Sequence, residues 1–227
     1  MTTIAQALDN TRQRIREAAM ACGRDAETIA LIAVSKTRPA GDIREAFAQG
    51  QHRFGESYVQ EAVEKIEALT DCAIEWHFIG PIQSNKTRQI AAHFDWVHGI
   101  DRIKIARRLS EQRPPELPRL NVCLQVNISA EASKSGMSLE ELLPTARAVA
   151  ALPRLRLRGL MAIPAPGDNA QQHYRDFSAV AAAQRQLLDQ GLELDTLSMG
   201  MSDDLEAAIR AGATLIRVGT AIFGERE

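Results

Sequence analysis

Cysteine is scarce in this chain, and its placement excludes the usual cysteine chemistry. The 227 residues include three cysteines, Cys22, Cys72 and Cys123, which are far apart in the sequence and form no CxxC pair. An odd number of widely spaced cysteines predicts reduced structural thiols rather than a disulfide framework or a thiolate metal site. We therefore expect a cytoplasmic protein without a bound metal.

Long apolar runs, blocks of one charge and an apparent signal peptide are also missing. No apolar stretch approaches the roughly 18 residues of a membrane-spanning helix. The first residues lack the charged and apolar regions of a secretion signal. The 27 basic and 29 acidic residues are interspersed and give a net charge of −2, without the basic stripe typical of nucleic-acid-binding proteins. We expect a soluble globular protein with neither a membrane nor a nucleic-acid partner.

What the chain does contain is a regular alternation of short apolar runs and helical segments. The first segment is helical, because apolar residues recur at spacings of three and four from Ile4 to Cys22, and Gly23 ends it. Eight strand candidates follow, at Ile29–Ser35, Arg53-Phe54, Glu75–Ile79, Trp96–His98, Asn121–Ile128, Arg156–Ala162, Thr196-Leu197 and Leu215–Val218.

Helical segments and helix-start signals separate these strands. Pro39 and Ser84-Asn85 are predicted to open two helices, and Ser138 with Glu141 has the pattern of a capping box. A long helix is predicted over Ala170–Gln190, and a short one that starts at Ser202-Asp203-Asp204 and reaches Ala211. Each strand candidate is therefore followed by a segment with helical pattern or helix-start chemistry.

This strict alternation predicts an α/β protein. It is typical of a single (β/α)8 TIM-type barrel domain over residues 1–227, with an extra N-terminal helix. A doubly wound open sheet is the alternative, because the second and seventh strands are short. That alternative loses support because no GxGxxG follows the first strand and no GxxxxGK[ST] occurs in the chain.

Lys36 stands at the end of the first strand candidate. Ligands of α/β barrels and open α/β sheets collect at the carboxyl ends of their strands. A partly desolvated amine at that position can attack a carbonyl and form a Schiff base. The alternative is that Lys36 is simply the first solvated residue after a core strand, since lysine is rarely buried.

The segments after the seventh and eighth strands have the composition of a phosphate site. Ser198 and Gly200 follow one strand, and Gly219 with Thr220 follows the other. In many barrels these two loops hold a phosphate through backbone N–H groups, to which hydroxyls can add hydrogen bonds. The alternative is that the glycines make tight turns and that the nearby Ser202 only caps a helix.

Arg217 is an unusual residue for the middle of a strand. The strand pleat places it on the face opposite Ile216 and Val218, where a guanidinium needs a partner because burying it unpaired is costly. One possibility is an internal ion pair with Glu56 or Asp203. The other is that Arg217 donates to a ring acceptor or an anion of a bound ligand.

Together, the lysine, the phosphate segments and Arg217 suit pyridoxal 5′-phosphate (PLP), which has an aldehyde, a phosphate and a pyridine nitrogen. A phosphosugar aldolase would use the first two elements equally well. His77 and His98 could act as acid–base groups or metal ligands, but the sequence has no HxH or HExxH motif. We interpret both histidines as hydrogen-bonded residues at strand ends.

Several longer segments have the wording of a known protein family. They are Leu31–Thr37, Phe54-Gly55-Glu56 with Tyr58–Glu61, Trp76–Lys86, Gly159–Pro164, Leu197–Asp204 and Val218–Gly224. In this order they closely resemble the YggS/PROSC family of pyridoxal phosphate homeostasis proteins. The resemblance covers essentially the whole chain and implies a barrel similar to the N-terminal domain of alanine racemase.

The resemblance also assigns roles to single residues. It implies that Lys36 carries PLP as a Schiff base, that Arg217 faces the pyridine nitrogen, and that Ser198, Gly219 and Thr220 hold the phosphate. The family usually has asparagine at the position of Ser57, which follows the Gly-Glu pair near the cofactor ring. A shorter hydroxyl there is expected to reach the ring through water.

The same chemistry separates a carrier from an enzyme. A PLP racemase needs a second acid–base group opposite the lysine, which alanine racemase supplies as a tyrosine beside an added β-domain of a partner subunit. The only tyrosines here are Tyr58 and Tyr174, and the chain ends soon after the eighth strand. An arginine at the pyridine nitrogen also weakens the electron sink that carbanion chemistry uses.

We therefore expect a PLP-binding homeostasis or carrier protein with little or no catalytic turnover. A racemase-like enzyme and a Schiff-base aldolase remain the alternatives. The expected partners are PLP and apo forms of PLP-dependent enzymes that receive it, and the expected state is a monomer. The sequence leaves open whether Lys134 takes part.

Overall fold

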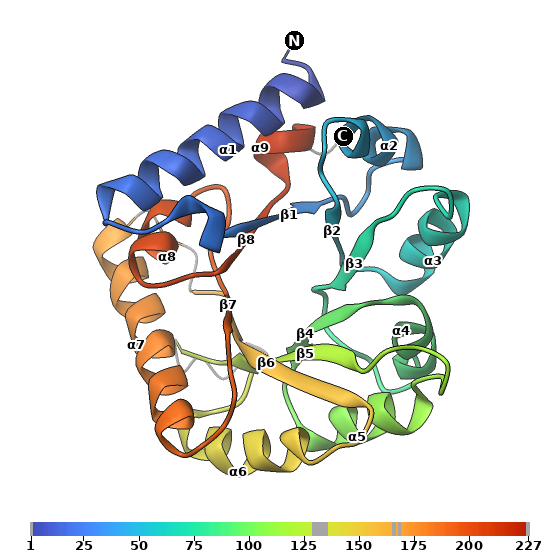
Figure 1. Ribbon diagram of the computed structural model, residues 1–227, viewed down its shortest axis with the longest axis vertical. Helices are drawn as coiled ribbons and strands as arrows, with labels where there is room; N and C mark the ends of the chain where they lie inside the picture. The colour runs from blue at the N-terminus through green and yellow to red at the C-terminus, as the bar shows by residue number, and fades with distance from the viewer. Residues whose placement is uncertain (1, 129–135, 165–166, 168, 226–227) are drawn as a thin grey trace.

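The computed structural model describes residues 2–128, 136–164, 167 and 169–225, and eight parallel strands form its centre (Figure 1). Each strand pairs with the next in the sequence, and the eighth pairs with the first, so the sheet closes into a barrel. The strands are β1 Ala30–Val34, β2 Arg53–Glu56, β3 Glu75–Phe78, β4 Trp96–Ile100, β5 Leu120–Val126, β6 Leu155–Ala162, β7 Thr196–Ser198 and β8 Leu215–Val218. The predicted TIM-type barrel is confirmed.

Helices follow the strands around the outside of the barrel (Figure 1). They are α2 Ala40–Ala48, α3 Val59–Ala68, α4 Thr87–His93, α5 Ile103–Gln112, α6 Leu139–Ala150, α7 Ala170–Asp189, α8 Leu205–Arg210 and α9 Thr220–Phe223, with a 3₁₀ turn at Ala26–Thr28 before β1. In the described ranges, no helix is both long and apolar enough to span a bilayer.

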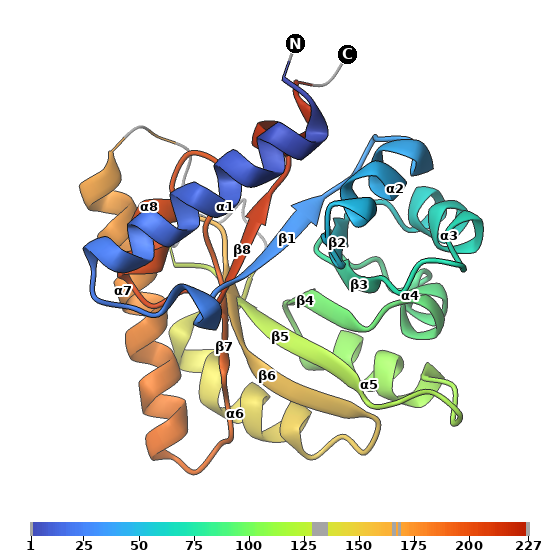
Figure 2. The same ribbon diagram turned by 45° about the horizontal axis from the view of Figure 1, so that its top comes forward.

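The extra N-terminal helix, α1 Ile4–Ala21, is also present. A capping box of Thr3 and Gln6 starts it, and its apolar face buries Leu8, Ile15 and Ala19. Figure 2 shows α1 lying across the side of the barrel beside α8 and α9, with which its residues are in contact. This helix therefore packs against the two helices that follow the predicted phosphate segments.

One helix start differs from the sequence-based predictions. The capping box of Ser138 and Glu141 forms as predicted at α6. α8 begins after Asp204, at the predicted Ser202-Asp203-Asp204 start, and Ser202 itself is not the capping residue. Ser84-Asn85 does not cap α4, because that helix begins at Thr87 after Lys86, and no side chain caps it. α4 is short, so the sequence gives only a weak periodic signal for its first turn.

Apolar side chains form two layers. The larger layer lies between the strands and the surrounding helices and includes Phe54, Phe78 and Val97. A smaller cluster of Ile32, Trp96, Cys123, Met161 and Leu215 forms a separate set of buried contacts. Its members alternate along their strands with residues of the outer layer, which places them inside the barrel.

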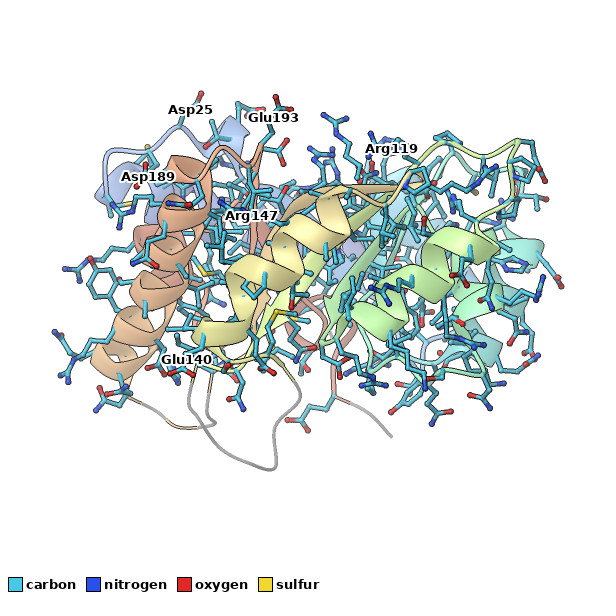
Figure 3. The ribbon with its side chains drawn as sticks, turned by 90° about the horizontal axis from the view of Figure 1, so that it is seen from below. Asp25, Arg119, Glu140, Arg147, Asp189 and Glu193 are labelled. Carbon is cyan, nitrogen blue, oxygen red and sulfur yellow. The ribbon has the colours of Figure 1, made fainter. Side chains whose placement is uncertain are left out.

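The two ends of the barrel differ in the residues they carry. Figure 3 shows Asp25, Arg119 and Glu193 along one edge of the molecule, and each precedes a strand. Glu140, at the start of α6, lies toward the other edge. Segments that leave the carboxyl ends of the strands gather on this second side, which is the side where barrel enzymes bind their ligands.

Candidate functional site

An open cavity of about 620 Å³ lies at the carboxyl ends of the strands. This volume falls in the range of small-molecule sites. The segments after β1, β2, β3, β6, β7 and β8 contribute to its wall, together with α1. The lining residues are Arg14, Val34, Lys36, Arg38, Ser57, Ile79, Ile163, Met201, Ser202, Asp203, Arg217, Gly219, Thr220, Ala221, Phe223, Gly224 and Glu225.

Five of the six predicted site residues meet in this cavity. Lys36, Ser57, Arg217, Gly219 and Thr220 all line it, although they come from the ends of three different strands, β1, β2 and β8. The cavity therefore brings an amine, a guanidinium, hydroxyls and backbone N–H groups to one ligand-sized space. The part that each of them takes in holding a ligand remains a prediction.

The sixth residue, Ser198, is placed differently. Its side chain is fully buried at the end of β7 and does not line the cavity. Its hydroxyl accepts a hydrogen bond of 2.7 Å from Nη1 of Arg217 and lies 2.7 Å from Nδ1 of His98. In this arrangement the Ser198 hydroxyl supports Arg217, whereas the nearby Ser202 lines the cavity.

The backbone around Lys36 is held in a strained shape. Thr37 has a φ of 65°, in the left-handed region that a β-branched residue rarely adopts. Its N–H donates a hydrogen bond of 2.6 Å to Oε1 of Glu61 on α3. A strained backbone conformation persists only where surrounding contacts hold it, and such conformations cluster at functional sites. The contact with α3 therefore fixes the direction in which the chain leaves Lys36.

A buried charged cluster lies next to this turn. Nζ of Lys65 is 2.8 Å from Oε1 of Glu56 and 2.8 Å from the carbonyl oxygen of Ser35, and it also pairs with Glu61. The Ser35 hydroxyl donates a 2.6 Å hydrogen bond to the same Glu56 oxygen. Burial raises the pKa of the Glu56 carboxyl above its usual value, and Lys65 opposes that shift.

Arg217 does not form the internal ion pair that was one of its two sequence-based interpretations. In the described part of the chain it pairs with neither Glu56 nor Asp203, because Glu56 is bonded to Lys65 and Ser35. Arg217 instead donates to Ser198 and, at 3.0 Å, to the carbonyl oxygen of Ala162. Burial lowers its pKa to about 10, so it remains a cation at neutral pH. Two bonds leave three of its five N–H donors for the cavity side.

The segment after β8 presents backbone N–H groups to the cavity. Gly219, Thr220 and Ala221 line it at the start of α9, where the first N–H groups of a helix have no acceptor within that helix. A Cβ at Gly219 would lie 3.1 Å from the carbonyl oxygen of Val34, so the close approach of β1 favours glycine. Together with the Thr220 and Ser202 hydroxyls, this segment can bind an anion.

Two further cations line the cavity, and sequence reasoning did not assign them a role. Arg14 reaches over from α1, pairs with Glu206 at 2.7 Å and donates to the Ser202 carbonyl at 3.1 Å. Arg38 donates to the carbonyl oxygens of Gly224 and Glu225, which also line the cavity. Nothing in the helical periodicity around Arg14 distinguishes it from a solvated residue.

His77 and His98 lie inside the barrel, fully buried, and are bonded to each other. Both are hydrogen-bonded, as the sequence suggested, although each lies within its strand, on β3 and β4. Among the described residues, no group of histidine, cysteine and carboxylate side chains has the arrangement of a metal site. Lys134 lies outside the described residues.

Comparison with known proteins gives consistent relatives over the full chain. Residues 6–227 match the family described as the alanine racemase N-terminal domain. The pyridoxal phosphate homeostasis protein of Pseudomonas aeruginosa is 61% identical over 100% of this chain and 97% of its own length. The protein of the same name from Escherichia coli K12 is 56% identical over 100% of this chain and 98% of its own.

Solved structures agree with this relationship. An unknown protein from Bifidobacterium adolescentis has a TM-score of 0.92 at 33% identity, covering 97% of this chain and 94% of its own. PipY of Synechococcus elongatus, solved with PLP bound, has a TM-score of 0.86 at 37% identity, covering 98% and 100%. Alanine racemase of Corynebacterium glutamicum, at 20% identity and a TM-score of 0.69, shares the fold over 96% of this chain and 61% of its own. The chain therefore belongs to the family of pyridoxal phosphate homeostasis proteins, built on the barrel of the alanine racemase N-terminal domain.

Proposed function

We propose that this protein binds PLP in the cavity at the carboxyl ends of its strands and acts in intracellular PLP homeostasis. One observation carries the proposal: Lys36 lines the same cavity as Arg217 and the Gly219–Ala221 segment, both of which are far from it in the sequence. Relatives that are 56–61% identical over the whole chain are named pyridoxal phosphate homeostasis proteins. PipY, at 37% identity, has been solved with PLP bound.

The residues in the cavity fit the cofactor. PLP brings an aldehyde that condenses with a primary amine, a phosphate and a pyridine nitrogen whose protein partner tunes its electronics. Lys36 is the one lysine among the described lining residues, and it supplies the amine. The N–H groups at the start of α9, with the hydroxyls of Thr220 and Ser202, supply donors for a phosphate.

Arg217 is the partner we assign to the pyridine nitrogen. Its two bonds inside the barrel fix the guanidinium, and it still reaches the cavity wall. A donor-only side chain can satisfy an unprotonated ring nitrogen but cannot accept a proton from it. Ser57 lines the same cavity from the end of β2, and we assign it to the ring, reached through water.

The described part of the cavity favours a carrier over a racemase. A racemase needs a second acid–base group on the side of the substrate opposite the lysine. Neither tyrosine is among the lining residues: Tyr58 is exposed at the start of α3, and the ring of Tyr174 lies under Arg210. Arginine at the ring nitrogen further disfavours carbanion chemistry, so we assign little or no turnover of amino acids.

Several finer assignments belong to the same proposal. Residues 1–227 act as one PLP-binding domain, the protein works as a monomer in the cytoplasm, and apo PLP-dependent enzymes receive the cofactor from it. The low nucleophilicity of the buried Cys123 fits this setting. Burial raises the pKa of Cys123 to about 12, so this thiol stays protonated and unreactive.

Reduction with borohydride tests the proposal directly. Purified protein incubated with PLP should gain a visible absorption band, and reduction should add a pyridoxyl-phosphate mass to the peptide that contains Lys36. Lys36→Ala should lose both signals, while Lys86→Ala should keep them as a matched lysine control. A wild-type protein that remains colourless and unmodified at saturating PLP would contradict the proposal. Racemisation of alanine or serine that depends on Lys36 would contradict the carrier role.

A further inference from the structure

A continuous row of hydrogen bonds crosses the inside of the barrel and ends at Arg217. From Arg217, Nη1 is 2.7 Å from Oγ of Ser198, and that oxygen is 2.7 Å from Nδ1 of His98. Nε2 of His98 is 2.9 Å from Nδ1 of His77, whose Nε2 is 2.9 Å from Oε1 of Glu75. The row thus connects β8 and β7 to β4 and β3.

The two ends of this row face different environments. Arg217 lines the cavity at the carboxyl ends of the strands. Glu75 is the first residue of β3, so it lies toward the amino ends, where it is partly exposed and pairs with Arg53 at 3.0 Å. Ser198, His98 and His77 between them are completely buried. The row is therefore a polar connection through an otherwise apolar interior.

The chemistry at the two ends allows only one direction of donation. Arginine has donors and no acceptor, so the Ser198 oxygen must accept from Arg217. At the other end, hydrogen bonding from His77 lowers the pKa of Glu75 to about 2, so this carboxylate can only accept. Nε2 of His77 must therefore carry a proton, and this N–H donates a hydrogen bond to the Glu75 carboxylate.

Neutral histidines complete this assignment. Burial lowers the pKa of His77, and it lowers that of His98 well below its usual value. A neutral ring has one donor and one acceptor, so Nδ1 of His77 accepts from Nε2–H of His98. Nδ1 of His98 then accepts from the Ser198 hydroxyl. Every hydrogen bond points from the guanidinium toward the carboxylate, an order in which neighbouring bonds strengthen one another.

The charged groups around the row keep the rings neutral. Arg217 and His77 both oppose a positive charge on His98, in addition to burial. Around His77, Glu75 and the more distant Asp95 favour a charge, but burial and the nearby Arg53 outweigh them.

Packing also holds the imidazole ring of His77 in place. The indole of Trp96 stacks on His77, with ring centroids 5.4 Å apart and an interplanar angle of 18°. His77 is thereby held from one side by an aromatic ring and at both nitrogens by hydrogen bonds.

We propose that Glu75, His77, His98 and Ser198 are positioning residues that fix the orientation and charge of Arg217 from the opposite end of the barrel. This inference rests on the proposed function. It means that Glu75 influences how the cofactor ring is held, although Glu75 does not line the cavity. With Nη1 directed to Ser198 and Nη2 to Ala162, the guanidinium has one available orientation toward the ring nitrogen.

The first test uses PLP-free protein, so it does not depend on cofactor binding. Long-range ¹H–¹⁵N spectra of the histidine side chains should show His77 and His98 as neutral Nε2–H forms. Those signals should not change between about pH 7 and pH 8. An Nδ1–H form of either ring, or a charged ring within this range, would overturn the proposed direction and with it the proposal.

The second test compares two carboxylates at the same end of the barrel. Glu75 pairs with Arg53, and Asp195, just before β7, pairs with Arg158 at 2.7 Å, but only Glu75 belongs to the row. Glu75→Gln should raise the dissociation constant for PLP about two- to thirtyfold and shift the visible band of the loaded protein. Asp195→Asn should change the constant by less than about twofold. Equal effects of the two substitutions would overturn the proposal.

The third test breaks the row next to Arg217 and restores it. Ser198→Ala should alter the visible band and weaken PLP binding, and Ser198→Thr, which keeps a hydroxyl, should recover most of both. Thermal unfolding of the PLP-free variants separates a loss of folding from a loss of positioning. If Ser198→Ala is folded and leaves the spectrum unchanged, the proposal is wrong. If wild-type protein fails to bind PLP, the proposed function fails, while the tautomer measurement still decides the direction of the row.

Discussion

Nζ of Lys65 lies 2.8 Å from Oε1 of Glu56, and both side chains are buried beside the turn that carries Lys36. The same ammonium reaches the carbonyl oxygen of Ser35, the residue before Lys36. The pair therefore ties α3 to the ends of β1 and β2. A buried ion pair adds little stability compared with apolar residues, but removing one partner leaves a buried group uncompensated.

Replacing Lys65 with methionine should strongly destabilise the protein. The substitution leaves Glu56 and the Ser35 carbonyl without their ammonium, and the loss of one buried partner costs about 3–5 kcal/mol. Urea unfolding of the PLP-free protein measures this change. Arg53→Ala, which breaks the exposed pair with Glu75, should cost no more than about 1 kcal/mol. Similar losses for the two variants would show that the Lys65 cluster is not structurally important.

Stability should fall as the pH drops below about 6.5, the ordinary pKa of histidine. In the folded state burial lowers the pKa of His77 and His98, so below this pH the unfolded chain binds more protons than the folded one. Each histidine contributes a slope of about 1.4 kcal/mol per pH unit until its folded-state pKa is reached. Urea unfolding between about pH 6.5 and pH 5 should show a smaller slope for His98→Gln. An unchanged slope in His98→Gln would show that this ring does not contribute to the pH dependence of stability.

Thr220→Val should weaken the binding of PLP without weakening that of pyridoxal, which lacks the phosphate. The substitution keeps the shape of the side chain and removes a hydroxyl from the cavity wall. A hydrogen bond to a charged group contributes about 1.5–3 kcal/mol, so the affinity for PLP should drop roughly 10- to 100-fold. Absorption titrations with both compounds provide the measurement. An equal loss for pyridoxal would place the Thr220 hydroxyl near another part of the ligand.

Gly80→Ala should disturb the site through Ser57. A Cβ on Gly80 would lie 2.3 Å from the carbonyl oxygen of Ser57, and this backbone has to move to make room. We expect a loss of about 1–3 kcal/mol in the free energy of unfolding, together with weaker PLP binding. Gly41→Ala is the matched control, since a Cβ there meets open space within α2 and should stabilise the helix by up to about 1 kcal/mol. Unchanged PLP affinity in Gly80→Ala would show that Ser57 does not contribute to binding of the ligand.

The barrel was predictable because its strands are read from local patterns. Buried parallel strands are near-continuous apolar runs, and the run before Lys36 is one of them. Strict alternation with helices then leaves few topologies. The positions of Lys36, Gly219 and Thr220 followed from the rule that barrel ligands collect at the carboxyl ends of strands.

The contacts between side chains of different strands were not predictable in the same way. Ser198 and Ser202 are four residues apart in one polar segment, and only the path of the chain decides which hydroxyl reaches the cavity. The row from Arg217 to Glu75 depends on strand register across the barrel, which the sequence does not encode locally. The burial of Lys65 has no local signal either, because its ammonium is enclosed only when α3 packs beside the ends of β1 and β2.

The helix α1 gives the cavity a wall that is separate from the barrel itself. The eight strands close their hydrogen bonding without it, and Arg14 reaches the cavity from its outer side. Detaching such a helix requires local rather than global unfolding, and local opening has a lower free energy than loss of the barrel. Detachment of α1 alone would therefore remove Arg14 from the cavity wall, with the strands that lead to Lys36 and Arg217 left intact.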